Sequence, residues 1–144
     1  MEIVRKMKVP VEFLYETILT SVLSDIQSQT GKKLTEKQLQ GFEYEKTFSK
    51  HAKATIRIEE ITKNKAYQYR TTSNKQDFIV SYKLRPLDDG SCELHYTEQM
   101  ESFGYLQKIN DSLIGLIWSP LKKRRFNEML KQIETTHLIE VEVK

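Results

Sequence analysis

The sequence predicts an α+β fold in which a curved antiparallel sheet of about six strands packs on a long C-terminal helix. Apolar residues recur at every second position from Phe42 to Met100, as in strands that bury one face. A helical period of three to four residues precedes this segment and returns after Gly104. Short polar breaks separate the strands, so consecutive strands should pair antiparallel.

The first predicted strand covers residues 2–9, where apolar and polar side chains alternate and Arg5 is the exception on the apolar side. Pro10 suits the first turn of a helix, because that position makes no use of an N–H group. The segment 11–33 should then form two short helices, or one amphipathic helix, that end near Gly31, with Thr20-Ser21 and Ser24-Asp25 as candidate breaks or caps. Its apolar residues at helical spacing are Val11, Leu14, Ile18, Val22 and Ile26.

Five further strands are predicted near residues 42–49, 53–61, 66–73, 77–85 and 91–101. The last two should form a hairpin around the turn at residues 88–90. Because residues of one parity share a face of a hairpin, we expect three inward-facing cross-strand pairs. They are Phe78 with Glu98, Val80 with Tyr96, and Tyr82 with Leu94.

The predicted C-terminal helix is long, and Pro120 should kink or split it. Its apolar positions are Leu106, Ile109, Leu113, Ile117, Leu130 and Ile133. Residues 138–144 alternate again and form either a short extra strand or a loose tail. Residues 1–137 are therefore expected to be a single domain, with residues 138–144 outside it.

The predicted inner face of the sheet is unusually polar. It carries five of the seven tyrosines, together with one lysine, one threonine and one glutamate; these residues are Tyr44, Lys46, Tyr67, Tyr69, Thr71, Tyr82, Tyr96 and Glu98. A buried hydroxyl without a partner costs about 1–3 kcal/mol, and closed cores are usually filled with aliphatic residues. A largely apolar cavity between the sheet and the helix is the simplest explanation. In the alternative, these groups satisfy one another, for example as a Lys46–Glu98 pair or a Glu98–tyrosine hydrogen bond, and have only a structural role.

The cavity hypothesis gives a set of candidate ligand contacts: Tyr44, Lys46, Tyr69, Phe78, Val80, Tyr82, Leu94, Tyr96, Glu98 and Ile117. We expect a non-enzymatic module that binds a small amphipathic or hydrophobic molecule. In an acid–base enzyme Glu98 would be the proton-transfer group, since no nucleophile is indicated. A protein-interaction domain that uses a sheet edge or residues 138–144 is the third hypothesis.

Composition excludes several other classes of function. The chain has 144 residues, a formal net charge of +3 and one cysteine, Cys92, which rules out an internal disulfide. Its three histidines have no metal-ligand spacing, so neither a metal nor a cofactor is expected. The basic run at 121–125 is followed by Glu128 and Glu134, which argues against nucleic-acid binding. With no signal peptide or membrane-spanning run, a cytoplasmic protein without membrane insertion is expected.

The order of these elements resembles that of the START-like superfamily, also called SRPBCC or helix-grip, which includes the birch pollen allergen and the polyketide cyclases. Within it, the chain is most similar to a small family of unknown function from Gram-positive bacteria. The residues that carry this closer resemblance are Gly41 to Lys46, Tyr82, Tyr96 to Glu98, Asn110, Lys122 and Lys123. The resemblance implies a cavity between the sheet and the C-terminal helix, and it implies no particular reaction.

Overall fold

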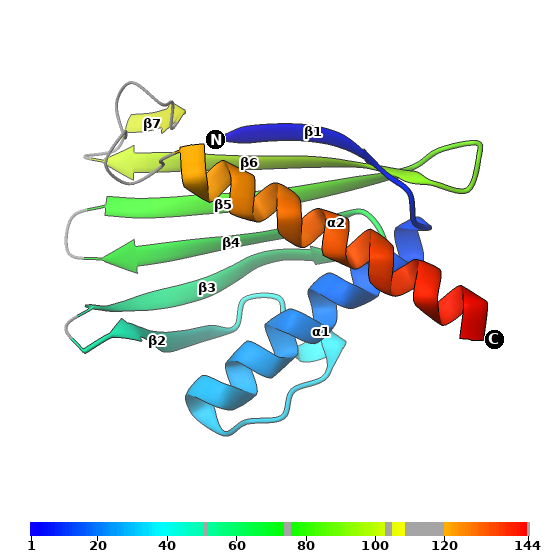
Figure 1. Cartoon of the computed structure of the whole chain (residues 1–144). Coiled ribbons are helices and arrows are strands. Elements are labelled where there is room, and N and C mark those ends of the chain that lie inside the picture. Colours follow the sequence, from blue (N-terminus) through cyan, green and yellow to red (C-terminus); the bar gives the residue numbers. More distant parts are fainter. Residues whose placement is uncertain (51, 74–75, 103–104, 109–119, 144) are drawn as a thin grey trace.

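The computed structural model describes residues 1–50, 52–73, 76–102, 105–108 and 120–143. Its elements are β1 (Glu2–Met7), α1 (Val11–Thr30), the short 3-10 helix η1 (Glu36–Gln38), β2 (Glu43–Ser49), β3 (Ala52–Thr62), β4 (Ala66–Ser73), β5 (Gln76–Pro86), β6 (Cys92–Ser102), β7 (Tyr105–Lys108) and α2 (Pro120–Val143). The strands pair antiparallel in the order β1-β6-β5-β4-β3-β2, and β7 pairs with the end of β6. Figure 1 shows both helices on one face of this sheet. The predicted α+β class, with an antiparallel sheet and a C-terminal helix, is confirmed.

One helix follows β1, and the prediction of two short helices is wrong. α1 runs for 20 residues without a break. Leu14, Val22 and Ile26 are buried along one side of it, and this tertiary packing outweighs the tendency of serine and threonine to interrupt a helix. The helix ends where predicted, because Gly31 adopts a φ of 76° and its N–H donates to the Gln27 carbonyl at 2.8 Å.

The β5–β6 hairpin forms as predicted, but its register differs from the expected one by two residues. The loop extends from Leu87 to Ser91, where the Asp89 carboxylate accepts a hydrogen bond from the Ser91 N–H at 3.1 Å. Gly90 provides the left-handed conformation of this loop, with a φ of 84°. A shift of two residues leaves each side chain on its predicted face. The observed pairs are Phe78 with Met100, Val80 with Glu98, and Tyr82 with Tyr96.

A β-bulge in β3 changes which residues face the helices. The register with β4 shifts between Ile58 and Glu60, so Glu59 is an extra residue in the strand. Beyond the bulge the alternation is inverted, and Ile61 packs against the buried core. The uniform alternation predicted over 53–61 therefore fails at its C-terminal end.

The C-terminal part of the chain differs most from the prediction. Residues 105–108, expected to be helical, form strand β7. The predicted helix positions Ile109, Leu113 and Ile117 lie outside the described residues. Residues 138–143 continue α2 and form neither an extra strand nor a loose tail. The helix therefore starts later and ends later than the sequence pattern suggested.

Apolar contacts attach α2 to the sheet through one side of the helix. Leu130 is buried with 1% of its surface exposed, and Ile133 is partly buried beside it. One turn earlier, the Phe126 ring lies over β6, with its centroid 4.3 Å from that of Tyr96. Ring contacts of this kind contribute about 0.5–1.5 kcal/mol beyond area burial.

Polar contacts attach α2 to the first strand. The Arg5 guanidinium donates to one carboxylate oxygen of Glu134 in an ion pair. The backbone N–H of Lys8 donates to the other oxygen at 2.8 Å. Arg5 is the residue that interrupted the apolar alternation of the first strand, and its inward position is explained by this contact across the two chain ends.

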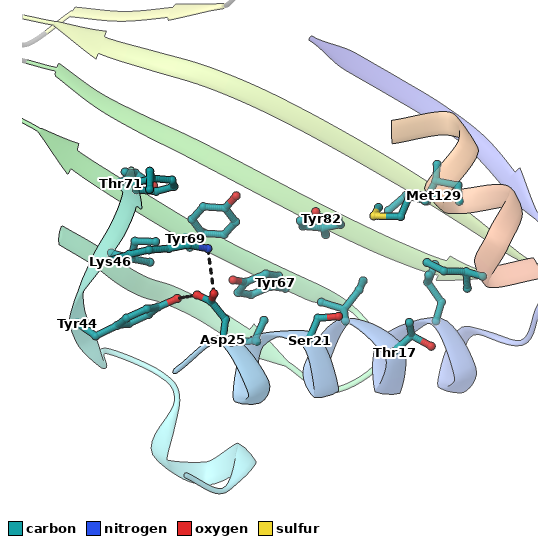
Figure 2. A pocket seen from close by; sticks show the side chains of 18 residues that line it. Thr17, Ser21, Asp25, Tyr44, Lys46, Tyr67, Tyr69, Thr71, Tyr82 and Met129 are labelled. Carbon is teal, nitrogen blue, oxygen red and sulfur yellow. Dashed lines mark hydrogen bonds and ion pairs between the residues drawn. The ribbon is translucent and has the colours of Figure 1, made fainter. Parts of the chain in front are cut away.

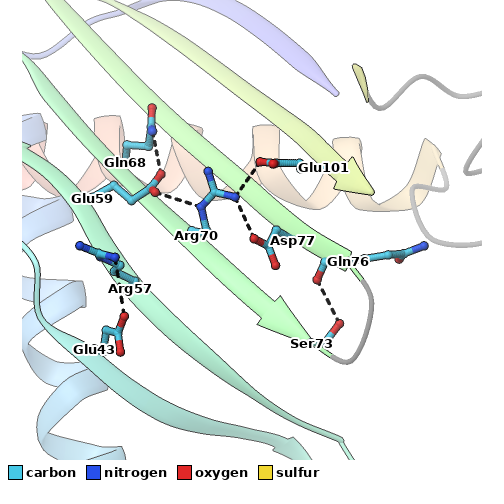
Figure 3. Close-up of polar contacts among 9 residues, drawn as sticks. All are labelled: Glu43, Arg57, Glu59, Gln68, Arg70, Ser73, Gln76, Asp77 and Glu101. Atoms are coloured by element: carbon cyan, nitrogen blue, oxygen red, sulfur yellow. Dashed lines mark hydrogen bonds and ion pairs between the residues drawn. The ribbon is translucent and has the colours of Figure 1, made fainter. Parts of the chain in front are cut away.

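The face of the sheet away from the helices satisfies its own charges (Figure 3). Arg70 donates to Glu59 at 2.9 Å and to Asp77 and Glu101 at 2.8 Å each. Gln68 donates to the second oxygen of Glu59 at 2.9 Å. Burial alone would raise the pKa of Glu59, but the hydrogen bonds from Gln68 and Arg70 outweigh burial and hold the pKa below its usual value.

Candidate functional site

A cavity of about 370 Å³ lies between the sheet and the two helices. The sheet contributes residues of β2 to β6, and α2 contributes Met129, Leu130 and Ile133. Figure 2 shows the side chains that surround this space. The cavity occurs on the face that the tyrosine pattern indicated, but its walls include a helix that the sequence reasoning did not consider.

α1 forms one long side of the cavity. It contributes six residues at helical spacing, which are Leu14, Thr17, Ile18, Ser21, Val22 and Asp25. The sequence reasoning treated the serine and aspartate only as potential breaks in the helix. The available signal was their position. Ser21 lies three residues after Ile18, and Asp25 lies four residues after Ser21, so both are on the side of the helix that carries Ile18.

Asp25 links α1 to strand β2 at one end of the cavity. The Tyr44 hydroxyl donates to Asp25 Oδ2 at 2.6 Å, and Lys46 Nζ lies 3.0 Å from Asp25 Oδ1 (Figure 2). Burial, and then the hydrogen bond to Asp25, raise the pKa of Tyr44. Lys46 thus pairs with Asp25 in place of the structural partner expected for it, Glu98.

Three tyrosines of the central strands form an aromatic wall. Tyr67 and Tyr82 are paired across β4 and β5 with ring centroids 5.6 Å apart, and the Tyr67 and Tyr69 centroids are 5.4 Å apart. Burial raises the pKa of all three hydroxyls, that of Tyr69 to about 12. Within the described part of the chain, none of the three hydroxyls has a hydrogen-bond partner. Each of them is therefore a protonated group that lines the cavity and is available to a guest or to water.

Exposed side chains mark one border of the cavity. Phe48 and Met129 belong to its wall and are 55% and 44% exposed. The Lys46 ammonium lies 5.3 Å from the centroid of the Phe48 ring, a distance typical of a cation–π contact. Phe48 sits at an irregularity in the pairing of β2 with β3, which explains why an aromatic residue of the inner parity is exposed.

The structure brings together half of the predicted contact residues. Tyr44, Lys46, Tyr69, Tyr82 and Leu94 line the cavity. Phe78, Val80, Tyr96 and Glu98 are not among the described residues of its wall, and Ile117 lies outside the described residues.

Glu98 is buried beside the first strand and is not among the described residues of the wall, although, after burial, its charge helps to raise the pKa of the wall residues Tyr69 and Tyr82. It is 3% exposed, and its carboxylate accepts a hydrogen bond from the Tyr96 hydroxyl. Its backbone N–H donates to the Met1 carbonyl at 3.0 Å, and its Oε2 lies 3.9 Å from the Met1 amino group. The Glu98–tyrosine contact corresponds to the structural alternative considered for this residue.

Other kinds of site have little support in the described residues. No group of three or more histidine, cysteine, aspartate or glutamate side chains there is arranged to hold a metal ion. Neither of the helices in that part of the chain combines the length and apolarity that crossing a bilayer requires. In the basic run, Lys123, Arg124 and Arg125 are exposed near the start of α2, and Arg124 pairs with Glu128 at 3.5 Å.

Fold and site together define an α+β domain in which one face of an antiparallel sheet and two helices enclose a cavity lined by tyrosines. The chain belongs to the family described as a domain of unknown function, DUF3284, whose model matches residues 1–119. No curated protein matches the sequence.

Similar folds occur among solved structures. Protein CV1439 from Chromobacterium violaceum has a TM-score of 0.55 at 19% identity, with 94% of each chain covered. Protein MLL2253 from Mesorhizobium loti has a TM-score of 0.56 at 14% identity, with 92% of this chain and 94% of that chain covered. At such identities the similarity concerns the fold alone, so function has to be argued from the cavity.

Proposed function

We propose that this domain binds a small amphipathic or hydrophobic molecule in the cavity between its sheet and its two helices. The observation that carries the proposal is the row of hydroxyls on Tyr67, Tyr69 and Tyr82, which lack partners among the described residues. A volume of about 370 Å³ lies within the range of small-molecule sites. Ile56 and Leu94 would desolvate such a guest, and the hydroxyls would orient it.

We further propose that the domain is START-like. The order of one strand, a helix, consecutive antiparallel strands and a closing helix supports this assignment, as does the position of both helices on one face of the sheet. In a fold of this kind the guest would be held between the sheet and the last helix. Among the described residues α1 contributes more of the wall than α2 does, so binding would depend on both helices.

Binding is favoured over acid–base catalysis because of where Glu98 lies. A general acid or base must come within hydrogen-bond reach of its substrate. Glu98 is 3% exposed, bonded to Tyr96, and absent from the described wall of the cavity. The enzymatic alternative therefore has no support from the position of this carboxylate.

Two matched variants on α1 test the proposal. Ser21 lines the cavity and Ser24, one turn away, does not; Ser21→Phe should fill the space and Ser24→Phe should not. Each protein is purified from its own host, checked for native stability and weighed by native mass spectrometry. We expect a bound small molecule on the wild type and Ser24→Phe, and its loss from Ser21→Phe. A wild type that carries no guest and binds no uncharged hydrophobic probe would overturn the proposal.

A further inference from the structure

The charges in the cavity wall cancel each other. Asp25 and Lys46 are the wall's only carboxylate and only ammonium among the described residues. They lie 3.0 Å apart, and the second oxygen of Asp25 already accepts the Tyr44 hydroxyl at 2.6 Å. An incoming carboxylate would lose hydration and meet Asp25 beside Lys46, the only ammonium of the described wall. A charged guest is therefore disfavoured in this wall.

The unsatisfied groups of the wall are hydrogen-bond donors. The hydroxyls of Tyr67, Tyr69 and Tyr82 have no partner among the described residues, and each carries a proton that needs an acceptor. A tyrosine hydroxyl is protonated at physiological pH, and burial raises the pKa of these three further. The oxygen of a carbonyl group would satisfy one or more of them without bringing a charge.

The shape of the wall favours a flat guest. The Tyr67 and Tyr82 rings are stacked, with 21° between their planes, and Tyr69 continues the row. Offset stacking and edge contacts with such rings favour aromatic or conjugated partners.

From these three features we propose that the cavity selects uncharged aromatic or conjugated molecules that carry a carbonyl acceptor, and discriminates against their carboxylate analogues. The proposal rests on the binding function proposed above and specifies the class of ligand. Its selectivity has two sources: the tyrosine hydroxyls recognise the acceptor, and Asp25 repels a negative charge.

Three fluorescent probes that share one ring system test the proposal. Prodan, a dimethylaminonaphthalene with a propionyl group, is uncharged and carries the carbonyl. Dimethylaminonaphthalene lacks the acceptor, and dimethylaminonaphthoate carries a carboxylate in its place. Each is titrated against the full chain by fluorescence. We expect prodan to bind about tenfold or more tightly than either analogue, because it alone gains hydrogen bonds without bringing a charge.

Variants separate the two sources of selectivity. Tyr67→Phe, Tyr69→Phe and Tyr82→Phe remove only a hydroxyl, and at least one should weaken prodan binding about two- to tenfold without weakening that of dimethylaminonaphthalene. Tyr15→Phe, outside the described wall, should leave prodan binding unchanged. Asp25→Asn should shift the preference toward dimethylaminonaphthoate, because Lys46 is then left without its counter-charge.

The possible outcomes distinguish this inference from the proposed function. Equal binding of all three probes, or preference of the wild type for the carboxylate, would overturn the selectivity but leave the cavity as a binding site. Equal weakening of prodan and dimethylaminonaphthalene by the tyrosine variants would overturn the role of the hydroxyls. Failure of all three probes to bind would overturn the selectivity, and together with a wild type that carries no native guest it would overturn the proposed function as well.

Discussion

Replacing Leu130 with alanine tests whether α2 is an integral part of the domain. Among the described side chains of α2, Leu130 alone is buried, with 1% of its surface exposed. The packing of α2 against the core includes Leu130, and the same side chain forms part of the cavity wall. If α2 were only loosely attached, this residue could be truncated at little cost.

The expected loss of stability follows from the atoms removed. Leucine exceeds alanine by three carbon atoms, and at about 0.8 kcal/mol per buried methylene their transfer is worth about 2.4 kcal/mol. A void closed on all sides would raise the cost toward about 5 kcal/mol. Leu130 already borders an open space of about 370 Å³, so that additional term is small. We therefore expect Leu130→Ala to lower the free energy of unfolding by about 2–3 kcal/mol.

Equilibrium unfolding in urea measures this loss, and Leu138 provides the matched control. Leu138 lies on the same helix and is 59% exposed, so Leu138→Ala should change stability by less than about 0.5 kcal/mol. With a slope of about 1–3 kcal/mol per molar urea, Leu130→Ala should lower the midpoint by about 0.7–3 M. If the two variants unfolded together, α2 would not be packed on the sheet in the way described.

Three further predictions follow from the polar contacts. Glu134→Gln should destabilise the domain in urea unfolding by about 1–3 kcal/mol, since a charged acceptor of two hydrogen bonds is lost. Glu128→Gln, at an exposed pair, should cost less than about 0.5 kcal/mol. Equal losses would contradict the contacts of Glu134 with Arg5 and Lys8. Because the folded-state pKa of Glu59 is lowered, its contribution to the free energy of unfolding is present above about pH 4.5 and is lost as the pH falls below that value. Glu59→Gln should thus lose less stability than the wild type on acidification, and parallel pH profiles would refute this. Because the folded-state pKa of Tyr69 is raised to about 12, its contribution to stability is lost as the pH rises from about 10 toward 12. Burial also raises the pKa of Tyr15 to about 12, so an ultraviolet titration of Tyr69→Phe should show a smaller component near pH 12 than the wild type, and an unchanged component would refute this.

Periodicity predicted most of the sheet because strand burial alternates locally. It placed the five central strands and the tyrosine-bearing face within a few residues of their observed positions. It failed where one residue changes the geometry: Glu59 adds a bulge that no alternation reveals, and the loop before Ser91 can centre the hairpin in more than one way with the same parity. The bulge and the hairpin register depend on tertiary packing and on turn geometry, and the alternation of apolar and polar residues predicts neither of them.

The candidate site was harder to predict than the fold because it combines strand residues, which follow a period of two, with helix residues, which follow a period of three to four. The strand pattern identified the tyrosines, but it could not show that Asp25 on α1 would meet Tyr44 and Lys46 on β2. That contact fixes the electrostatics of the cavity, and it requires knowing which side of α1 packs on which strand. Parity also assigned Glu98 to the inner face correctly, yet it did not show that this residue is not among the described residues of the wall.

The distribution of bonded and unbonded polar groups is consistent with the proposed binding function. Arg70 on the outer face has three carboxylate partners, Glu134 is bonded twice, and Asp25 uses both of its oxygens. Phenylalanines in place of the three wall tyrosines would pack as well, because the ring alone makes the apolar contacts. In the described structure no protein group is bonded to the three hydroxyls, which are open to water or to a guest. The proposed guest would give these hydroxyls a hydrogen-bond partner.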